Sequence, residues 1–273
     1  MSEIKNNTVV VLTGSTRGIG LGLARSFLAE GCRVIISGRV QDQVDDACKT
    51  LSQEYGADHI KGLACDVSEY DQVQSLWDFS KQQFEQIDIW INNAGLGHIS
   101  LPFWEQDVEK IDEILSVNLQ GTMYGSRVAI LGMLSQGWGH VYNMEGLGSD
   151  GRVISGQTIY GTSKSGLAYL TKALARETRA TRLNVSALSP GMVITDLLLG
   201  NTDISSDSFK KGKKIFNILA DRVETVTPWM VRQILSNSGK GRDIRWLTTR
   251  KIFWRFLCAP FSKRDVFNEG SGL

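Results

Sequence analysis

The stretch VVVLTGSTRGIG, from Val9 to Gly20, decides the fold. Its four leading apolar residues are typical of a buried strand, and the glycine-rich turn that follows leads into a helical pattern. In such a turn Gly14 permits a tight reversal, Gly18 lets the backbone approach a ligand, and Gly20 lets the helix pack closely on the strand. Because the first N–H groups of a helix are unpaired, this sequence predicts a binding site for a pyrophosphate.

Short β-branched runs alternate with helical patterns along the rest of the chain. This alternation predicts a parallel sheet covered on both faces, because each crossover connection is right-handed and lies over the sheet. We therefore expect an α/β fold with a doubly wound parallel sheet of the Rossmann type. The predicted strands are Thr8–Leu12, Arg33–Ser37, Ile60–Ala64, Ile87–Ile91, His140–Asn143, Asn184–Leu188 and Ile244–Leu247, and the predicted helices lie near Gly18–Glu30, Gln43–Tyr55, Tyr70–Phe84, Val108–Leu134 and Thr158–Arg179.

The length of 273 residues fits a single α/β domain with an appended element. We expect a dinucleotide-binding and catalytic domain over residues 1–247 and a basic, aromatic C-terminal extension over residues 248–273. After Pro190 the pattern loosens, and residues 192–236 are predicted to form a lid on the substrate side. In a doubly wound sheet the ligand binds at the carboxyl ends of the strands, which such a lid would cover.

Composition excludes several classes of protein. With 30 basic and 29 acidic residues the net charge is +1, so no global field attracts nucleic acid. The four cysteines and three histidines have no ligand-like spacing, so we expect no metal. The sequence has no secretory signal and no run of about 18 apolar residues that would span a bilayer. We expect a soluble protein of a bacterial cytoplasm, or of a plastid stroma after removal of a transit peptide.

Tyr160 and Lys164 are four residues apart in the sequence YGTSK, so a helix places them on one face. A free phenol has a pKa of ~10, which is poorly matched to proton transfer near neutrality. A nearby ammonium favours the phenolate and is expected to lower the pKa of Tyr160. This spacing also occurs on ordinary helices, but its position after a strand and a glycine-rich turn favours catalysis. We predict that Tyr160 protonates a carbonyl oxygen while hydride reaches the carbon.

The end of the second predicted strand selects the nicotinamide cofactor. An acidic residue there would accept hydrogen bonds from the ribose 2′-OH of NAD and would repel a 2′-phosphate. The sequence VIISGRV has Arg39 in this place, and Arg17 in the glycine-rich turn adds a second guanidinium. Two guanidinium groups can bind a phosphate through charge-assisted hydrogen bonds, so we expect NADPH. The alternative is that both arginines are ordinary solvated surface residues.

Four motifs, in this order, resemble those of the short-chain dehydrogenase/reductase family: TGSTRGIG at Thr13–Gly20, NNAG at Asn92–Gly95, YGTSK at Tyr160–Lys164 and PGMVITD at Pro190–Asp196. The resemblance implies that Asn118 holds a water in a relay to Lys164, and that the protein forms a homo-oligomer. It also implies that Asp66 binds the adenine and that Val193 and Thr195 contact the nicotinamide carboxamide. The residues expected around the cofactor are Gly14, Thr16, Arg17, Gly18, Ile19, Gly20, Arg39, Asp66, Val67, Asn93, Ala94, Gly95, Tyr160, Lys164, Pro190, Gly191, Val193 and Thr195.

The family's carbonyl-binding serine is expected about 13 residues before the tyrosine, where this chain has Leu147. The nearest hydroxyl is that of Ser149, and a rearrangement of the glycine-rich loop would bring it to the same place. We therefore predict Ser149 as the fourth catalytic residue. The alternatives are that Ser155 or Thr158 takes this role, or that Tyr160 acts without a second hydroxyl.

A narrower resemblance is to the chlorophyll(ide) b reductases. The sequence YNMEGLGSDGR at Tyr142–Arg152 is similar to the spelling FNMDGAGSDG of that group, with Glu145 and Leu147 in place of Asp and Ala. Further similarity lies in SPGMVITDLLL (Ser189–Leu199), FNILADRVETV (Phe216–Val226) and IRWLTTRKIFWRF (Ile244–Phe256). The resemblance implies reduction of the 7-formyl group of chlorophyll b or chlorophyllide b to 7-hydroxymethyl, with a large hydrophobic tetrapyrrole as substrate. The alternatives are a general reductase of lipid-like ketones or steroids and a non-catalytic, nucleotide-binding regulatory protein.

An amphipathic helix is predicted from about Thr249 to Cys258, ending before Pro260. The predicted apolar arc consists of Ile252, Phe253, Trp254, Phe256 and Leu257, with Lys251 and Arg255 on the opposite side. We expect the apolar arc to dock onto the domain. The mixture of aromatic and basic residues also suits a pocket wall for a large substrate, or a peripheral contact with a membrane.

Overall fold

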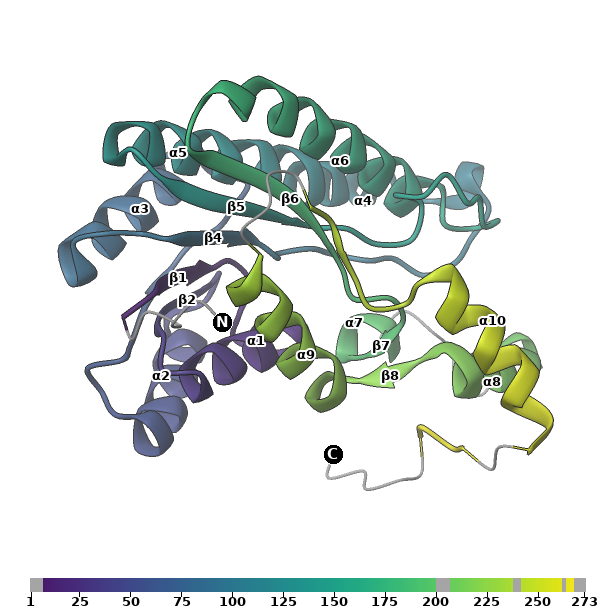
Figure 1. Ribbon diagram of the computed structural model, residues 1–273. Coiled ribbons are helices and arrows are strands. Elements are labelled where there is room, and N and C mark those ends of the chain that lie inside the picture. The colour runs from purple at the N-terminus through teal and green to yellow at the C-terminus, as the bar shows by residue number, and fades with distance from the viewer. Residues whose placement is uncertain (1–6, 200–206, 238–241, 262–263, 268–273) are drawn as a thin grey trace.

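A seven-stranded parallel sheet forms the centre of the protein in the computed structural model, which describes residues 7–199, 207–237, 242–261 and 264–267 (Figure 1). The strand order is β3-β2-β1-β4-β5-β6-β9, and every neighbouring pair is parallel. This confirms the predicted doubly wound α/β fold. The strands are β1 (Val9–Leu12), β2 (Arg33–Gly38), β3 (Ile60–Ala64), β4 (Ile89–Asn92), β5 (Gly139–Met144), β6 (Leu183–Ser189) and β9 (Ile244–Arg245).

Helices cover both faces of the sheet, as Figure 1 shows. Side chains alternate along each strand, so Val10 and Leu12 of β1 join one apolar core while Val9 and Val11 join the other. The first core lies under α1 (Gly18–Ala29), α2 (Gln41–Tyr55) and α9 (Val223–Ser236), and the second lies under α3 (Tyr70–Phe84) and α5 (Gly121–Gln136). The strand order reverses between β1 and β4, and the carboxyl ends of these strands are therefore where a ligand is expected.

The predicted helix Val108–Leu134 is divided into three parts. Helix α4 (Val108–Leu115) passes into a π-helical turn (Ser116–Gln120), which leads into α5. Asn118 lies in this turn, fully buried, and its carbonyl accepts a hydrogen bond from Thr122 Oγ1 at 2.8 Å. Because π-helical turns occur frequently at functional sites, this departure from the predicted helix points to Asn118.

The predicted lid, residues 192–236, is too long at its C-terminal end. It contains β7 (Val193–Ile194), α7 (Asp196–Leu199), α8 (Asp207–Leu219) and β8 (Asp221–Arg222), and its residues 200–206 lie outside the described residues. Helix α9, however, is part of the core, because Val226, Met230 and Val231 are fully buried against α1 and the sheet. A lid function for residues 192–222 stays a proposal.

Helix α10 (Thr249–Cys258) has the predicted bounds but the opposite orientation. Arg255 faces the domain, where it binds the buried Asp221 at 2.8 Å and donates to the carbonyl of Leu219 at 3.0 Å. Lys251 lies over the ring of Trp246. The prediction that the apolar arc docks onto the domain is wrong, because buried Asp221 attracts the basic side of the helix. The large apolar side chains that α10 exposes are those of Phe253, Trp254, Phe256 and Leu257.

Helix α6 (Thr158–Glu177) connects β5 to β6 and covers the sheet beside β6 (Figure 1). Within the described residues, no helix has the length and apolar character needed to cross a membrane.

Candidate functional site

The glycine-rich turn is shaped for an anion. Gly14 and Gly18 have φ values of +60° and +56°, which side chains disfavour, and a β-carbon on Gly14 would lie 2.7 Å from Ala94 Cα. Helix α1 begins directly after Arg17, with no side-chain cap and no acidic residue in its first turn. Its first N–H groups therefore suit a pyrophosphate, which is the group that the predicted dinucleotide would bring.

Asn93 and Ala94, which directly follow β4, hold this turn in place through hydrogen bonds. The Asn93 amide donates to the carbonyls of Thr13 and Gly14 at 2.9 and 2.8 Å, and the backbone N–H groups of Asn93 and Ala94 both donate to Thr13 Oγ1. In the structure the Asn93 side chain thus holds the loop in shape. Gly20 allows the close packing predicted for it, because a β-carbon there would lie 2.3 Å from the Gly14 carbonyl.

Arg17 and Arg39 are exposed at the same corner of the sheet. Gly38, at the end of β2, lies against Thr16, because a β-carbon on Gly38 would be 2.8 Å from the Thr16 methyl group. Arg39 therefore follows directly beside the turn that carries Arg17. Within the described part of the chain neither guanidinium has an ion-pair partner, which leaves both available to a phosphate.

The remaining predicted cofactor residues lie around the carboxyl ends of the strands. Asp66 follows β3 and accepts hydrogen bonds from the N–H and hydroxyl of Ser68, while Val67 is buried against Gly121. Thr195 lies opposite the turn, since a β-carbon on Gly18 would be 3.6 Å from the Thr195 methyl group. The others continue the same edge: Ile19 packs on the core, Pro190 and Gly191 follow β6, Gly95 follows β4, and Val193 is buried in β7.

Tyr160, Lys164 and Asn118 come together beside Gly95. A β-carbon on Gly95 would lie 3.4 Å from Asn118 Oδ1 and 3.8 Å from Lys164 Nζ. The Asn118 amide is held by Leu96, whose N–H donates to Oδ1 at 2.7 Å and whose carbonyl accepts from Nδ2 at 2.9 Å. Lys164 Nζ lies 5.7 Å from the centre of the Tyr160 ring and donates to the Met144 carbonyl at 3.0 Å.

Burial dominates the titration of both catalytic candidates. It raises the pKa of Tyr160 to about 12, so the predicted lowering of this pKa by the ammonium is not seen from the chain's own groups. Burial also lowers the pKa of Lys164 to about 8, against the attraction of Glu145, which raises it. Tyr160 is therefore a protonated donor, and Lys164 changes charge close to neutral pH.

The residue beside the reactive phenol is Gly146. A β-carbon on Gly146 would lie 2.5 Å from Tyr160 Oη and 3.4 Å from Lys164 Cε. Counting back from Tyr160 predicted Leu147 for the position of the missing serine, whereas the residue whose backbone lies against the phenol oxygen is Gly146. The phenol therefore occupies the space that a side chain at position 146 would take.

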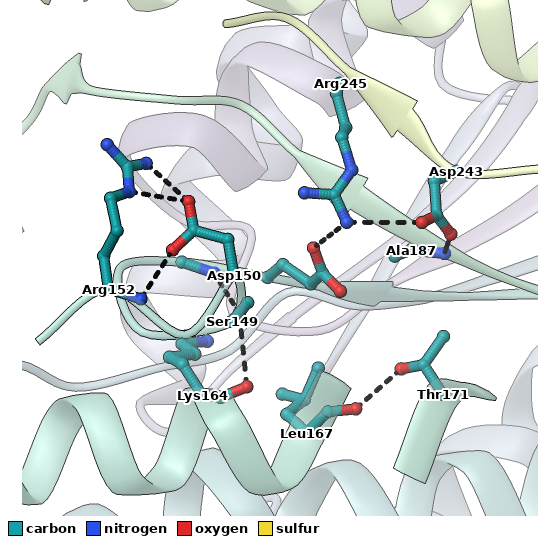
Figure 2. Close-up of polar contacts among 11 residues, drawn as sticks. Ser149, Asp150, Arg152, Lys164, Leu167, Thr171, Ala187, Asp243 and Arg245 are labelled. Carbon is teal, nitrogen blue, oxygen red and sulfur yellow. Dashed lines mark hydrogen bonds and ion pairs between the residues drawn. The ribbon is translucent and has the colours of Figure 1, made fainter. Parts of the chain in front are cut away.

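Ser149 holds this loop on helix α6. Its Oγ donates to the Lys164 carbonyl at 3.2 Å and accepts from the Gly146 N–H at 3.1 Å, as Figure 2 shows for Ser149 and Lys164. Both partners are backbone groups, and the role of Ser149 as the carbonyl-binding hydroxyl stays a prediction. The alternatives Ser155 and Thr158 are exposed.

The sequence analysis missed His98, which is buried against the start of α6. The Tyr160 N–H donates to His98 Nε2 at 3.4 Å, and the other ring nitrogen lies 2.7 Å from the Ile99 carbonyl. An Nε2 that accepts leaves Nδ1 to donate to the Ile99 carbonyl. Its only signal in the sequence is its position three residues after Gly95, which did not distinguish it from an ordinary loop residue.

Comparison with known proteins identifies the family. Residues 8–203 match the sequence model of the family described as short chain dehydrogenase. The chloroplastic chlorophyll(ide) b reductase NOL of Oryza sativa subsp. japonica is 39% identical over 257 residues, which cover 91% of this chain and 74% of the relative. The enzyme of the same name from Arabidopsis thaliana is 39% identical over 273 residues, covering 95% of this chain and 77% of the relative.

A solved structure has the same fold. The 3-ketoacyl-(acyl-carrier-protein) reductase from Brucella melitensis, complexed with NADH, superimposes with a TM-score of 0.77 at 23% identity, over 89% of this chain and 98% of the other. The order of the motifs, the position of the site at the carboxyl ends of the strands and the family match agree. This chain belongs to the short-chain dehydrogenase family.

Proposed function

We propose that this oxidoreductase uses NADPH to reduce the 7-formyl group of chlorophyll b or chlorophyllide b to 7-hydroxymethyl. The observation that carries the proposal is the 39% identity, over 91% and 95% of this chain, to two relatives that are named chlorophyll(ide) b reductases. In the site itself, the Tyr160 hydroxyl lies against the backbone of Gly146, which fixes the position of the proposed proton donor.

An exposed apolar rim beside Tyr160 supports a large hydrophobic substrate. The loop after β4 exposes Ile99, Leu101, Phe103 and Trp104, and the loop after β5 exposes Val153 and Ile154. The two loops touch, since a β-carbon on Gly156 would lie 2.2 Å from Ser100 Oγ. Exposed apolar patches of this kind mark binding surfaces, and a flat macrocycle would cover this one.

Each residue of the site has a defined task in this reaction. NADPH, when bound, supplies the hydride that reaches the aldehyde carbon. The glycine-rich turn binds the pyrophosphate, and Arg17 and Arg39 bind the 2′-phosphate. Tyr160 donates its proton to the aldehyde oxygen, and Lys164 replaces that proton, with Asn118 holding the water of the relay. Ser149 keeps Gly146 against the phenol through its two backbone contacts.

The test is turnover of the pigment. Purified protein is incubated with NADPH and chlorophyllide b, and the product is separated by chromatography and identified by its absorbance spectrum and mass. We expect a product heavier by two hydrogens, with one NADPH consumed for each pigment reduced. Activity on small ketones without turnover of chlorophyllide b would instead support a general reductase of lipid-like ketones or steroids.

The alternative of a non-catalytic nucleotide-binding protein is tested with Tyr160→Phe. This substitution removes one hydroxyl and keeps the ring, so we expect NADPH binding to stay within about twofold while pigment reduction falls about 10³-fold. A regulatory protein would show no turnover in either form.

A further inference from the structure

A buried carboxylate, that of Glu145, belongs to the residue after the carbonyl that Lys164 contacts. Glu145 follows β5, its N–H donates to the Leu188 carbonyl at 2.7 Å, and its side chain is only 2% exposed. Lys164 donates to the carbonyl of Met144, the residue directly before Glu145, so the ammonium and the carboxylate flank one peptide unit. Burying an unpaired carboxylate costs free energy, so the buried side chain of Glu145 is expected to have a partner of opposite charge.

The partner of Glu145 comes from the last strand of the sheet. Arg245 of β9 lies 3.2 Å from Glu145 Oε2, and within the described residues this oxygen accepts no hydrogen bond. The same guanidinium contacts Asp243 at 3.3 Å, and Asp243 accepts from the Ala187 N–H at 3.4 Å, as Figure 2 shows. The carboxylate is thus paired in charge with Arg245, while its Oε2 accepts no hydrogen bond within the described residues.

We propose that Glu145 is a positioning residue that keeps Lys164 protonated near neutral pH, and that Arg245 keeps Glu145 ionised for this purpose. The proposal rests on the proposed role of Lys164 in recharging Tyr160. It makes the protonation state of Lys164 depend on Arg245 of β9, the strand that leads into the C-terminal extension. Neither residue needs to touch the substrate.

The charges that face Glu145 act in both directions. Burial raises its pKa, and the carboxylates of Asp243 and Asp150 raise it further. Arg245, from β9, and Lys172, from α6, lower it. Arg245 has the largest effect among these charges, so its removal is expected to raise the pKa of Glu145 further and to weaken its negative charge.

The first measurement is the pH profile of kcat/KM. We expect the wild-type rate to fall as pH rises through about 8, where Lys164 loses its proton. In Glu145→Gln we expect the pH at which kcat/KM falls to be lower by about one unit. At pH values above the wild-type fall, the rate is then expected to be roughly tenfold lower than that of the wild type. Arg245→Gln is expected to produce the same shift, and the double variant no further shift, because both act through one carboxylate. Glu145→Asp retains the charge and is expected to retain the wild-type profile.

Asp150→Asn is the matched control. Asp150 is an acid of the same loop, but it is more exposed and pairs with Arg152 at 2.7 Å, as Figure 2 shows. We expect its removal to leave the profile within about 0.2 pH units of wild type. A profile that is unchanged in both Glu145→Gln and Arg245→Gln, or one that moves as far in Asp150→Asn, would overturn the proposal.

A second measurement does not require a substrate. The folded-state pKa of Lys164, about 8, lies below the unfolded value of about 10.4, so stability is expected to rise with pH between these values. Glu145→Gln is expected to lower the pH at which stability begins to rise, because it lowers the folded-state pKa of Lys164. This change is expected to be absent when Lys164 is also replaced, as in Lys164→Met. If the effect persists without Lys164, the proposal is wrong; if chlorophyllide b is not reduced while the effect holds, only the proposed substrate fails.

Discussion

Gly146→Ala tests the geometry of the site most directly. The added β-carbon would lie 2.5 Å from Tyr160 Oη, whereas unstrained heavy atoms lie about 3.5 Å apart. The phenol oxygen must therefore retreat by about 1 Å. A displacement of that size at a reacting group costs about 10²-fold in rate, or about 2.7 kcal/mol in the activation barrier. We expect kcat for pigment reduction to fall by about this factor.

The assay separates this effect from unfolding and from loss of cofactor. Kinetic constants are measured with saturating NADPH, the affinity for NADPH by fluorescence titration, and the thermal midpoint by circular dichroism. We expect NADPH affinity and thermal midpoint to remain near wild type. Gly161→Ala is the control, because a β-carbon there meets nothing within 4 Å although the residue is next to Tyr160.

Gly146→Ser sharpens the test. It introduces a hydroxyl one residue before Leu147, where the family resemblance implies one, but its β-carbon has the same short distance to the phenol oxygen. We therefore expect a loss similar to that of the alanine variant. An increase in kcat in Gly146→Ser, or an unchanged kcat in Gly146→Ala, would refute the reasoning that the Tyr160 hydroxyl needs the space that a side chain at position 146 would take.

Three further predictions follow from other parts of the molecule. Arg39→Asp is expected to lower the NADPH preference over NADH by at least about tenfold, measured as the ratio of kcat/KM values, because a carboxylate repels the 2′-phosphate. Asp221→Asn is expected to lower the free energy of unfolding by about 2 kcal/mol in urea denaturation, less than for a fully buried pair because the Arg255 and Arg264 side chains are 18% and 32% exposed. Trp254→Ser is expected to reduce co-sedimentation with anionic lipid vesicles if the exposed face of α10 contacts membranes, and an unchanged sedimented fraction would argue against that contact.

The sheet and its helices were predictable because their periodicity is local. The bounds of α3, Tyr70–Phe84, and of β3, Ile60–Ala64, are those predicted, since a run of apolar residues at a fixed period has one stable arrangement. Helix α9 was missed because Pro228 lies within it and interrupts the pattern. Its apolar side chains are nevertheless buried against α1, so tertiary packing outweighs the local cost.

The surroundings of Tyr160 were less predictable because they depend on a loop. A count of 13 residues back from Tyr160 gives Leu147, but Gly148 and Gly151 have positive φ values of +98° and +82° and change the path of the chain. A count along such a segment is not a distance in space. Tyr160 and Lys164 could be predicted from their residue types and spacing, whereas the contact between Gly146 and the phenol could be found only from the folded structure.

The side of α10 that faces the domain could not be predicted from the sequence pattern either. The separation of apolar from basic residues around this helix was correct, but the pattern cannot say which side faces the protein. That choice depends on Asp221, which is buried in β8, where it pairs with Arg255 and accepts from Trp246 Nε1 at 2.6 Å. The energetic reason is that a buried carboxylate without partners costs more than exposed aromatic rings do.

The loop after β5 carries two consecutive residues that bear on the proposed proton donor and its neighbour. The backbone of Gly146 lies against the Tyr160 hydroxyl, and Glu145 raises the pKa of Lys164. In the proposed reaction the position of the phenol depends on the first residue, and its proton supply depends on the second. Substitutions at the two positions are therefore expected to change different quantities: kcat at every pH for Gly146→Ala, and the pH profile for Glu145→Gln.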